Sequence, residues 1–128
     1  MNDTGLSAWL EAYRQAWESR DPYAAAALFS ADAEYFETPF GTPARGPEGV
    51  RDYWANATRN QSDITFSYVI VCTSGDAAVA RWEAAFTRVT SGVTARLDGV
   101  FLLRFDGEGL CRELREWWHI VEAGTPDT

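Results

Sequence analysis

The stretch that decides the fold is ARLDGVFLLRFDGEGLCRELREWWHI, which runs from Ala95 to Ile120. Apolar residues or glycine occupy every second position from Leu97 to Phe105, which is the period of a strand with one buried face. The segment DGEG at 106–109 contains residues that tolerate positive φ, so the chain can reverse direction there. The pattern therefore predicts a long β-hairpin.

One charged residue lies on the predicted inward face of the returning strand. Leu114, Glu116, Trp118 and Ile120 share that face because strand side chains alternate. An ionised carboxylate between large apolar neighbours is costly unless it is paired or hydrogen-bonded. Glu116 is therefore the first candidate for a functional residue, although a buried structural ion pair with Arg81 is an equally good reading.

The opposite face of the hairpin is also partly apolar. Val100, Leu102 and Trp117 point away from the side that carries Phe101 and Trp118. A sheet face in contact with water is normally more polar. We expect a second copy of the chain to cover it, which gives a homodimer through the outer face of the sheet.

Length and composition indicate one globular domain of 128 residues, with 46% hydrophobic and 14% aromatic residues. The formal net charge of -8 argues against binding to nucleic acid or to an anionic membrane surface. No apolar leader follows a basic start, and no run approaches a membrane-spanning length. We therefore expect a soluble, cytoplasmic protein.

The cysteines and the histidine do not form a pattern typical of metal binding or nucleophilic catalysis. Cys72 and Cys111 are far apart in predicted strands, which favours two small buried side chains over a disulfide. His119 is the single histidine, which excludes a His-rich metal cluster and disfavours a His-based triad. We expect neither a metal nor an organic cofactor.

Upstream of the hairpin the hydrophobic period changes from that of helices to that of strands. We expect helices at about 5–20, 24–29 and 46–57, and strands at about 34–37, 64–72 and 79–89. This order predicts an α+β fold in which three helices from the N-terminal half pack on one face of a curved antiparallel sheet. We expect one domain over 1–123 and a loose tail at 124–128.

Four segments carry a family resemblance: SRD at 19–21, LFSADA at 28–33, GPEGVR at 46–51 and GVFLLRFD at 99–106. Together with the element order, they resemble the NTF2-like superfamily and SnoaL-like proteins in particular, over nearly the whole chain. The resemblance implies a cone-shaped fold with the helices on the concave face of the sheet. This fold hosts isomerases, cyclases, epoxide hydrolases, dehydratases and noncatalytic modules.

The resemblance to ketosteroid isomerases is incomplete at the catalytic positions. Tyr13 stands where those enzymes carry a phenol donor on the first helix. The positions of their general-base and oxyanion-hole aspartates are Thr38 and Phe101 in this chain. Steroid isomerisation by that mechanism is therefore not expected.

The resemblance to limonene-epoxide-hydrolase-like proteins is closer. Their Arg-x-Asp and Arg-Asp-aromatic patterns correspond to RWE at 81–83 and REW at 115–117, so both aspartates are glutamates here. The resemblance implies that Glu116 is the base that activates water, with Arg81 as a bridge and Glu83 as the acid. It implies in the same way that Tyr35 and Glu37 hold the water.

The sequence leaves open which face of its strand carries Arg81 and Glu83. If Trp82 and Phe86 belong to the outer face, Arg81 and Glu83 point into the cone, where an arginine between carboxylates would separate their pKa values. If Trp82 and Phe86 fill the core, Arg81 and Glu83 form a solvated or interface pair. Alternation permits both arrangements.

Aromatic residues are numerous enough to line a pocket as well as to fill a core. The residues expected to bind substrate are Tyr13, Trp17, Phe36, Phe40, Trp54, Phe101 and Trp118. The first functional hypothesis is an enzyme that acts on a small hydrophobic molecule by cofactor-independent acid–base chemistry, such as epoxide hydrolysis, isomerisation or cyclisation. The alternatives are a noncatalytic binder of small ligands and a homodimeric structural module.

Overall fold

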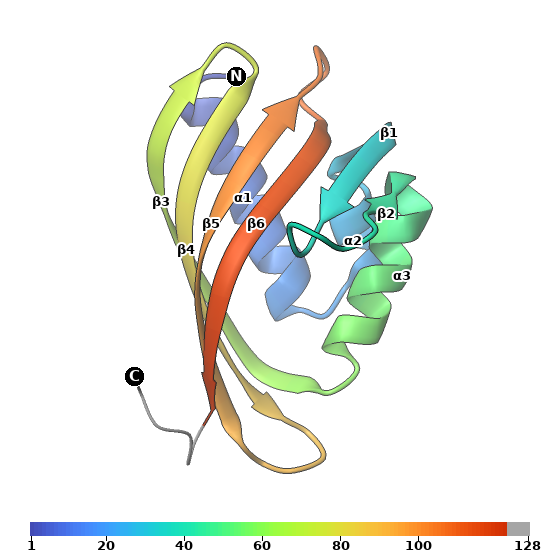
Figure 1. The fold of residues 1–128 in the computed structure, drawn as a ribbon, viewed down its shortest axis with the longest axis vertical. Helices are drawn as coiled ribbons and strands as arrows, with labels where there is room; N and C mark the ends of the chain where they lie inside the picture. Colours follow the sequence, from blue (N-terminus) through green and yellow to red (C-terminus); the bar gives the residue numbers. More distant parts are fainter. Residues whose placement is uncertain (123–128) are drawn as a thin grey trace.

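The computed structural model describes residues 1–122, which form three helices and one sheet of six strands. The helices are α1 (Asp3–Glu18), α2 (Pro22–Ala26) and α3 (Gly46–Thr58). The strands are β1 (Phe29–Phe36), β2 (Ala44–Arg45), β3 (Gln61–Ser74), β4 (Ala77–Arg88), β5 (Thr94–Phe105) and β6 (Cys111–Glu122). Figure 1 shows a strongly curved sheet with α1 lying across its concave side.

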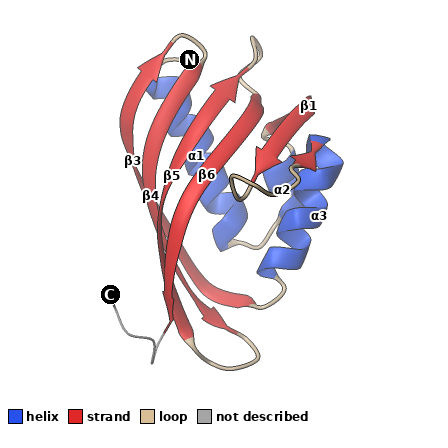
Figure 2. Ribbon diagram, in the orientation of Figure 1, coloured by secondary structure: helices blue, strands red, loops and turns tan. Residues whose placement is uncertain are grey.

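The order of the strands across the sheet is β2-β1-β6-β5-β4-β3. Neighbouring strands from β3 to β6 are antiparallel, as expected for strands that short turns connect. The pairing of β1 with β6 is parallel, so the sheet is mixed rather than wholly antiparallel. The helices lie on the concave side of the sheet (Figure 2), which confirms the α+β class.

Local sequence signals explain the two N-terminal helices. The Asn2 side chain accepts a hydrogen bond from the Gly5 N–H at 2.8 Å and caps α1. Asp21 caps α2 in the same way, and Pro22 follows at the first helical position. Leu6 and Leu10 of α1 are completely buried against the sheet.

The sheet contributes one continuous apolar face to the core. Phe101, Leu103 and Leu114 of the β5–β6 hairpin are completely buried, and Phe101 lies opposite Glu116 in the register. Buried residues from the first helix to the last strand belong to one hydrophobic cluster. The expected loose tail at 124–128 lies outside the described residues.

A close contact between β4 and β5 sets the face of each residue in β4. The ring of Trp82 lies over Gly99, and a Cβ atom on Gly99 would come within 2.5 Å of Trp82 Cε2. Trp82 and Phe86 are 2% and 3% exposed and belong to the core. Of the two arrangements that the sequence permits, the structure has Trp82 inside and Arg81 and Glu83 outside.

None of the helices in residues 1–122 is both long and apolar enough to cross a membrane.

Candidate functional site

A cavity of about 190 Å³ lies between α1, α3 and the concave side of the sheet. Aromatic side chains from α1, α3, β4 and β6 provide most of its wall. The residues that line it include Tyr13, Trp17, Glu37, Tyr53, Trp54, Trp82, Arg88, Glu116 and Trp118. The cavity therefore combines a large apolar surface with a small number of acidic and hydroxyl groups.

Glu116 is the buried carboxyl group of this cavity. It projects inward from β6 and is only 5% exposed. The Tyr35 hydroxyl donates a hydrogen bond to Glu116 Oε2 at 2.9 Å. The Tyr13 and Tyr35 hydroxyls lie 3.0 Å apart. Because the Tyr35 hydroxyl hydrogen is donated to Glu116, the Tyr13 hydroxyl is the donor to Tyr35. The three groups form a hydrogen-bonded chain from α1 through β1 to β6.

Burial controls the ionisation of this chain. Loss of hydration raises the pKa of Glu116 to about 8, the Tyr35 hydrogen bond opposes this effect, and the nearby charge of Glu37 adds to it. Burial and the charge of Glu116 raise the pKa values of Tyr13 and Tyr35 well above the ordinary tyrosine value. At neutral pH, Glu116 is therefore mainly a neutral carboxylic acid with two protonated phenols behind it.

The indole rings around the acid pack closely. Trp17 and Trp54 have ring centroids 4.9 Å apart. The Trp17 Nε1 group donates to Gln61 Oε1 at 2.8 Å, and Trp118 Nε1 donates to the Glu37 backbone carbonyl at 3.1 Å. Among the described residues, the buried Nε1 groups of Trp54 and Trp82 have no hydrogen-bond acceptor. The cavity wall thus contains two indole N–H groups that are free to donate a hydrogen bond.

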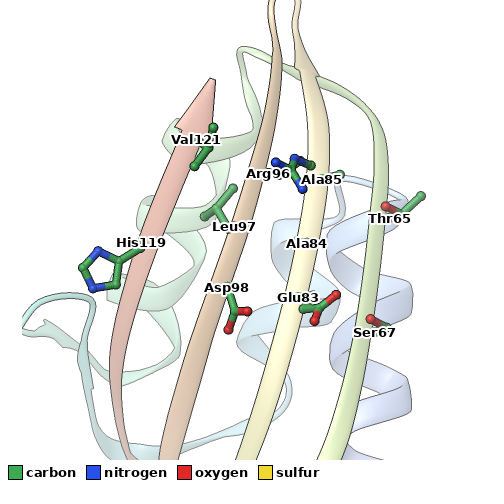
Figure 3. Close-up of a pocket in the computed structure, with 10 residues that line it drawn as sticks. All are labelled: Thr65, Ser67, Glu83, Ala84, Ala85, Arg96, Leu97, Asp98, His119 and Val121. Carbon is green, nitrogen blue, oxygen red and sulfur yellow. The ribbon is translucent and has the colours of Figure 1, made fainter. Parts of the chain in front are cut away.

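The hypothesis that places Arg81 and Glu83 beside Glu116 is wrong. Both side chains lie on the outer face of the sheet and are 56% and 62% exposed. Arg81 Nη2 lies 2.6 Å from Asp98 Oδ2 and 3.6 Å from Glu83 Oε1. Figure 3 shows Glu83 and Asp98 in a shallow hollow on this outer face, together with His119. The charged residues of RWE at 81–83 therefore do not reach the cavity.

The predicted binding residues divide into three groups: those on the cavity wall, one in the core beneath it, and two outside the site. Tyr13, Trp17, Trp54 and Trp118 line the cavity, and Phe101 lies beneath them in the core, stacked on Trp82.

Phe36 and Phe40 do not reach the cavity, contrary to expectation. The guanidinium of Arg115 covers the Phe36 ring at 3.9 Å, and Phe40 is fully exposed. Strand alternation turns Phe36 away from the side that carries Tyr35. Hydrophobicity alone could not separate these two residues from the cavity wall.

Glu37 and Tyr35 do lie at the site, Tyr35 as the donor to Glu116 and Glu37 on the cavity wall. The sequence reasoning did not assign Tyr53, Trp82 or Arg88 to the site. The helical spacing of Tyr53 with Val50 on α3 could have indicated its inward position.

A curved mixed sheet with three helices on its concave face is the fold of NTF2-like proteins. Within that class, the chain belongs to the SnoaL-like domain family, whose pattern matches residues 10–114. A search of curated protein sequences finds no significant match.

Solved structures with the same fold share few residues with this chain. The RV0760c protein of Mycobacterium tuberculosis superposes with a TM-score of 0.80 at 17% identity and covers 96% of this chain and 99% of its own. SalBIII, an epoxide hydrolase/cyclase-like enzyme of pyran ring formation in salinomycin, gives 0.79 at 16% identity, with 94% and 98% covered. The Δ5-3-ketosteroid isomerase of Mycobacterium sp. gives 0.73 at 20% identity, with 93% and 98% covered. At these identities the likeness shows the fold alone.

Proposed function

We propose that the protein binds a small, largely apolar molecule in the cavity and acts on it by acid–base chemistry at Glu116. The observation that carries the proposal is a buried carboxyl group, hydrogen-bonded by Tyr35, on the wall of an aromatic cavity. Burial raises the pKa of this group to about 8. A group with a pKa near the working pH is suited both to give a proton and to take it back.

The hydrogen-bond chain defines what each residue does in this chemistry. Tyr35 occupies Glu116 Oε2, so Oε1 is the oxygen left to carry the proton. Once Glu116 has given its proton to an oxygen of the substrate, Tyr35 stabilises the resulting carboxylate, and Tyr13 supports Tyr35. The carboxylate can then remove a proton from a neighbouring carbon or hydroxyl, which completes an isomerisation or a cyclisation.

The proposed chemistry does not use the epoxide-hydrolase pattern. An arginine bridge and a second acid would have to come from Arg81 and Glu83, and both lie on the outer face. Glu37 remains a second carboxylate at the cavity and could hold a water molecule for epoxide opening. Among the similar structures, one is described as an epoxide hydrolase/cyclase-like enzyme and one as a ketosteroid isomerase, which supports isomerisation and cyclisation as the reactions to test first.

The test is turnover of apolar epoxides and enolisable ketones by the wild type and Glu116→Gln. Removing the acid is expected to lower turnover by about 100-fold or more, because general acid–base catalysis contributes at least this much. Glu113→Gln is the matched control, since Glu113 lies on the same strand, pairs with Arg115 and does not line the cavity. Wild-type turnover in E116Q would overturn the proposal.

A noncatalytic binder is the second candidate. It is favoured by the position of Arg81 and Glu83, which leaves the cavity without the charged pair that the hydrolase pattern provides. A binder would quench tryptophan fluorescence with apolar compounds and return them unchanged after long incubation. Chemical conversion of any compound that E116Q does not convert would exclude this candidate.

We further propose that a second copy of the chain covers the outer face of the sheet. Val100 and Trp117 are neighbours in the register and are 38% and 46% exposed. Arg81 of β4 pairs with Val100 of β5 in the register. The next pair on the same face consists of the acidic residues Glu83 and Asp98. Two copies related by a two-fold axis can therefore set the arginine of one against the acids of the other.

A further inference from the structure

The charges around the cavity favour a cationic ligand. The charged residues that line it include Glu37, Glu116 and Arg88. The Arg88 Nε group donates to Glu122 Oε1 at 2.8 Å, so its charge is already balanced. The chain as a whole has a formal charge of -8. With Arg88 paired, the negative charge on the wall is that of Glu37 at neutral pH, and Glu116 adds a second one when it ionises. The local field and the overall charge of the chain therefore both favour cations over anions.

The aromatic wall adds to this preference. Four tryptophans line the cavity: Trp17, Trp54, Trp82 and Trp118. The face of an aromatic ring is electrostatically negative, and tryptophan binds cations more strongly than the other aromatic residues. The protein already uses this interaction beside the cavity, where the Arg88 guanidinium lies 5.0 Å from the centroid of the Phe86 ring.

We propose that the ligand of the cavity carries a compact ammonium group, held against the indole faces beside Glu116 and Glu37. The inference rests on the proposed function for the location of the ligand and adds its charge and size. A volume of about 190 Å³ accommodates an alkylammonium or a single-ring amine. Dispersion contacts with the walls bind the carbon skeleton, and the carboxyl groups select the charge.

Binding of an ammonium group is coupled to ionisation of Glu116. The groups that face Glu116 are Tyr13 from α1, Tyr35 from β1, Tyr53 from α3 and the carboxyl of Glu37. The tyrosines stay protonated, because burial raises their pKa values well above the ordinary value. A bound cation favours the carboxylate and lowers the pKa of Glu116, so binding at a pH between the bound pKa and the free pKa of about 8 releases up to one proton.

This coupling gives the two ligand classes opposite pH dependences. The affinity for a quaternary ammonium ion is expected to rise with pH up to about 8 and then to level off. A neutral ligand that accepts a hydrogen bond from protonated Glu116 would instead bind more weakly above that pH. A quaternary probe has no proton of its own, so the pH dependence reports the protein alone.

The experiment compares choline with 3,3-dimethylbutan-1-ol, which has nearly the same shape and no charge. Both are titrated against the tryptophan fluorescence of the full chain at several pH values. Choline is expected to bind about 10-fold more tightly than the alcohol above pH 8, in line with a desolvated cation–π contact. Equal affinity, tighter binding of the alcohol, or no response to either compound would overturn the inference.

A variant separates this inference from the proposed function. Glu116→Gln should lose about 10-fold in choline affinity at alkaline pH and keep its affinity for the alcohol. The matched control Glu113→Gln should bind both compounds like the wild type. Loss of turnover in E116Q without any preference for choline would overturn only the inference. A preference for choline with full turnover in E116Q would overturn only the proposed function.

Discussion

The raised pKa of Glu116 links the ionisation of one residue to the stability of the whole chain. Its carboxyl group titrates at about 8 in the folded chain, against an ordinary value of 4.5. Between these values the folded chain binds more protons than the unfolded chain, so the free energy of unfolding falls as pH rises. This direction is the reverse of that for a salt-bridged carboxylate, whose folded pKa is lowered.

Glu116→Gln is expected to abolish this pH dependence. Gln keeps the shape of the side chain and can accept the Tyr35 hydrogen bond, but it does not ionise. The variant should match the wild type at about pH 5 and exceed its free energy of unfolding by on the order of 4 kcal/mol at about pH 9. Urea unfolding across this range measures both curves. Parallel curves would mean that Glu116 ionises normally in the folded protein.

At the scale of elements, the contact between Trp82 and Gly99 fixes how β4 faces β5. Trp82 is 2% exposed and stacks on Phe101, with ring centroids 5.3 Å apart. The Trp82 ring packs against Trp17, Phe66 and Phe101, so it cannot move aside for a new methyl group without disturbing these contacts. Gly99 is therefore required for packing rather than for backbone conformation.

Gly99→Ala is expected to lower the free energy of unfolding by about 1–3 kcal/mol, the usual cost of overpacking a core. The new Cβ atom would lie 2.5 Å from two carbons of the Trp82 ring. Gly107→Ala is the control, because a Cβ atom there has no neighbour within 4 Å in the described structure. Thermal or urea unfolding compares the two variants. Equal stability of G99A and G107A would contradict the contact.

The same contact explains what the sequence could and could not predict. The alternation of apolar and polar residues predicts the strands and the inward position of Glu116, because both depend only on the period of the pattern. Which face of the sheet carries Arg81 depends on whether the odd or the even residues of β4 point inward. The contact between Trp82 and Gly99 decides this, and it is a tertiary contact. The sequence feature that could have indicated the inward position of Trp82 is Gly99, a residue without a side chain in the neighbouring strand.

The sequence could not predict the direction of β1 relative to its partner strand for a related reason. Its partner β6 lies at the far end of the described chain, and the two strands pair in parallel. A hydrophobic period is the same in both directions, so it contains no information on whether a pair is parallel. The Tyr13 to Glu116 chain depends on this pairing, because Tyr35 of β1 connects its two ends.

At the scale of the whole molecule, the proposed dimer would form through the outer face of the sheet. The hollow in Figure 3 has a volume of about 410 Å³ and carries both acidic and basic side chains. Val100 and Trp117 provide exposed apolar area next to it. An exposed tryptophan on a sheet face is the kind of residue that contributes most to an interface.

Trp117→Ser is expected to weaken a dimer formed through this face by about 10-fold or more in Kd. Sedimentation at micromolar concentrations should show a dimer for the wild type and a shift toward monomer for the variant. Tyr23→Ser is the control, because Tyr23 is also exposed but lies on α2. A monomeric wild type would exclude the dimer.

The short pairing of β1 with β6 also affects how quickly the cavity can exchange its contents. The described ladder between them ends at Phe36 and Arg115, and the Glu37 carbonyl beyond it is held by Trp118 Nε1. The segment after β1 lies beyond the paired part of these two strands, so a motion of this segment does not require β1 and β6 to separate. Loop motions of this kind take nanoseconds to microseconds. Residence time in the cavity would then depend on the strength of the contacts inside it and not on the slow opening of the fold.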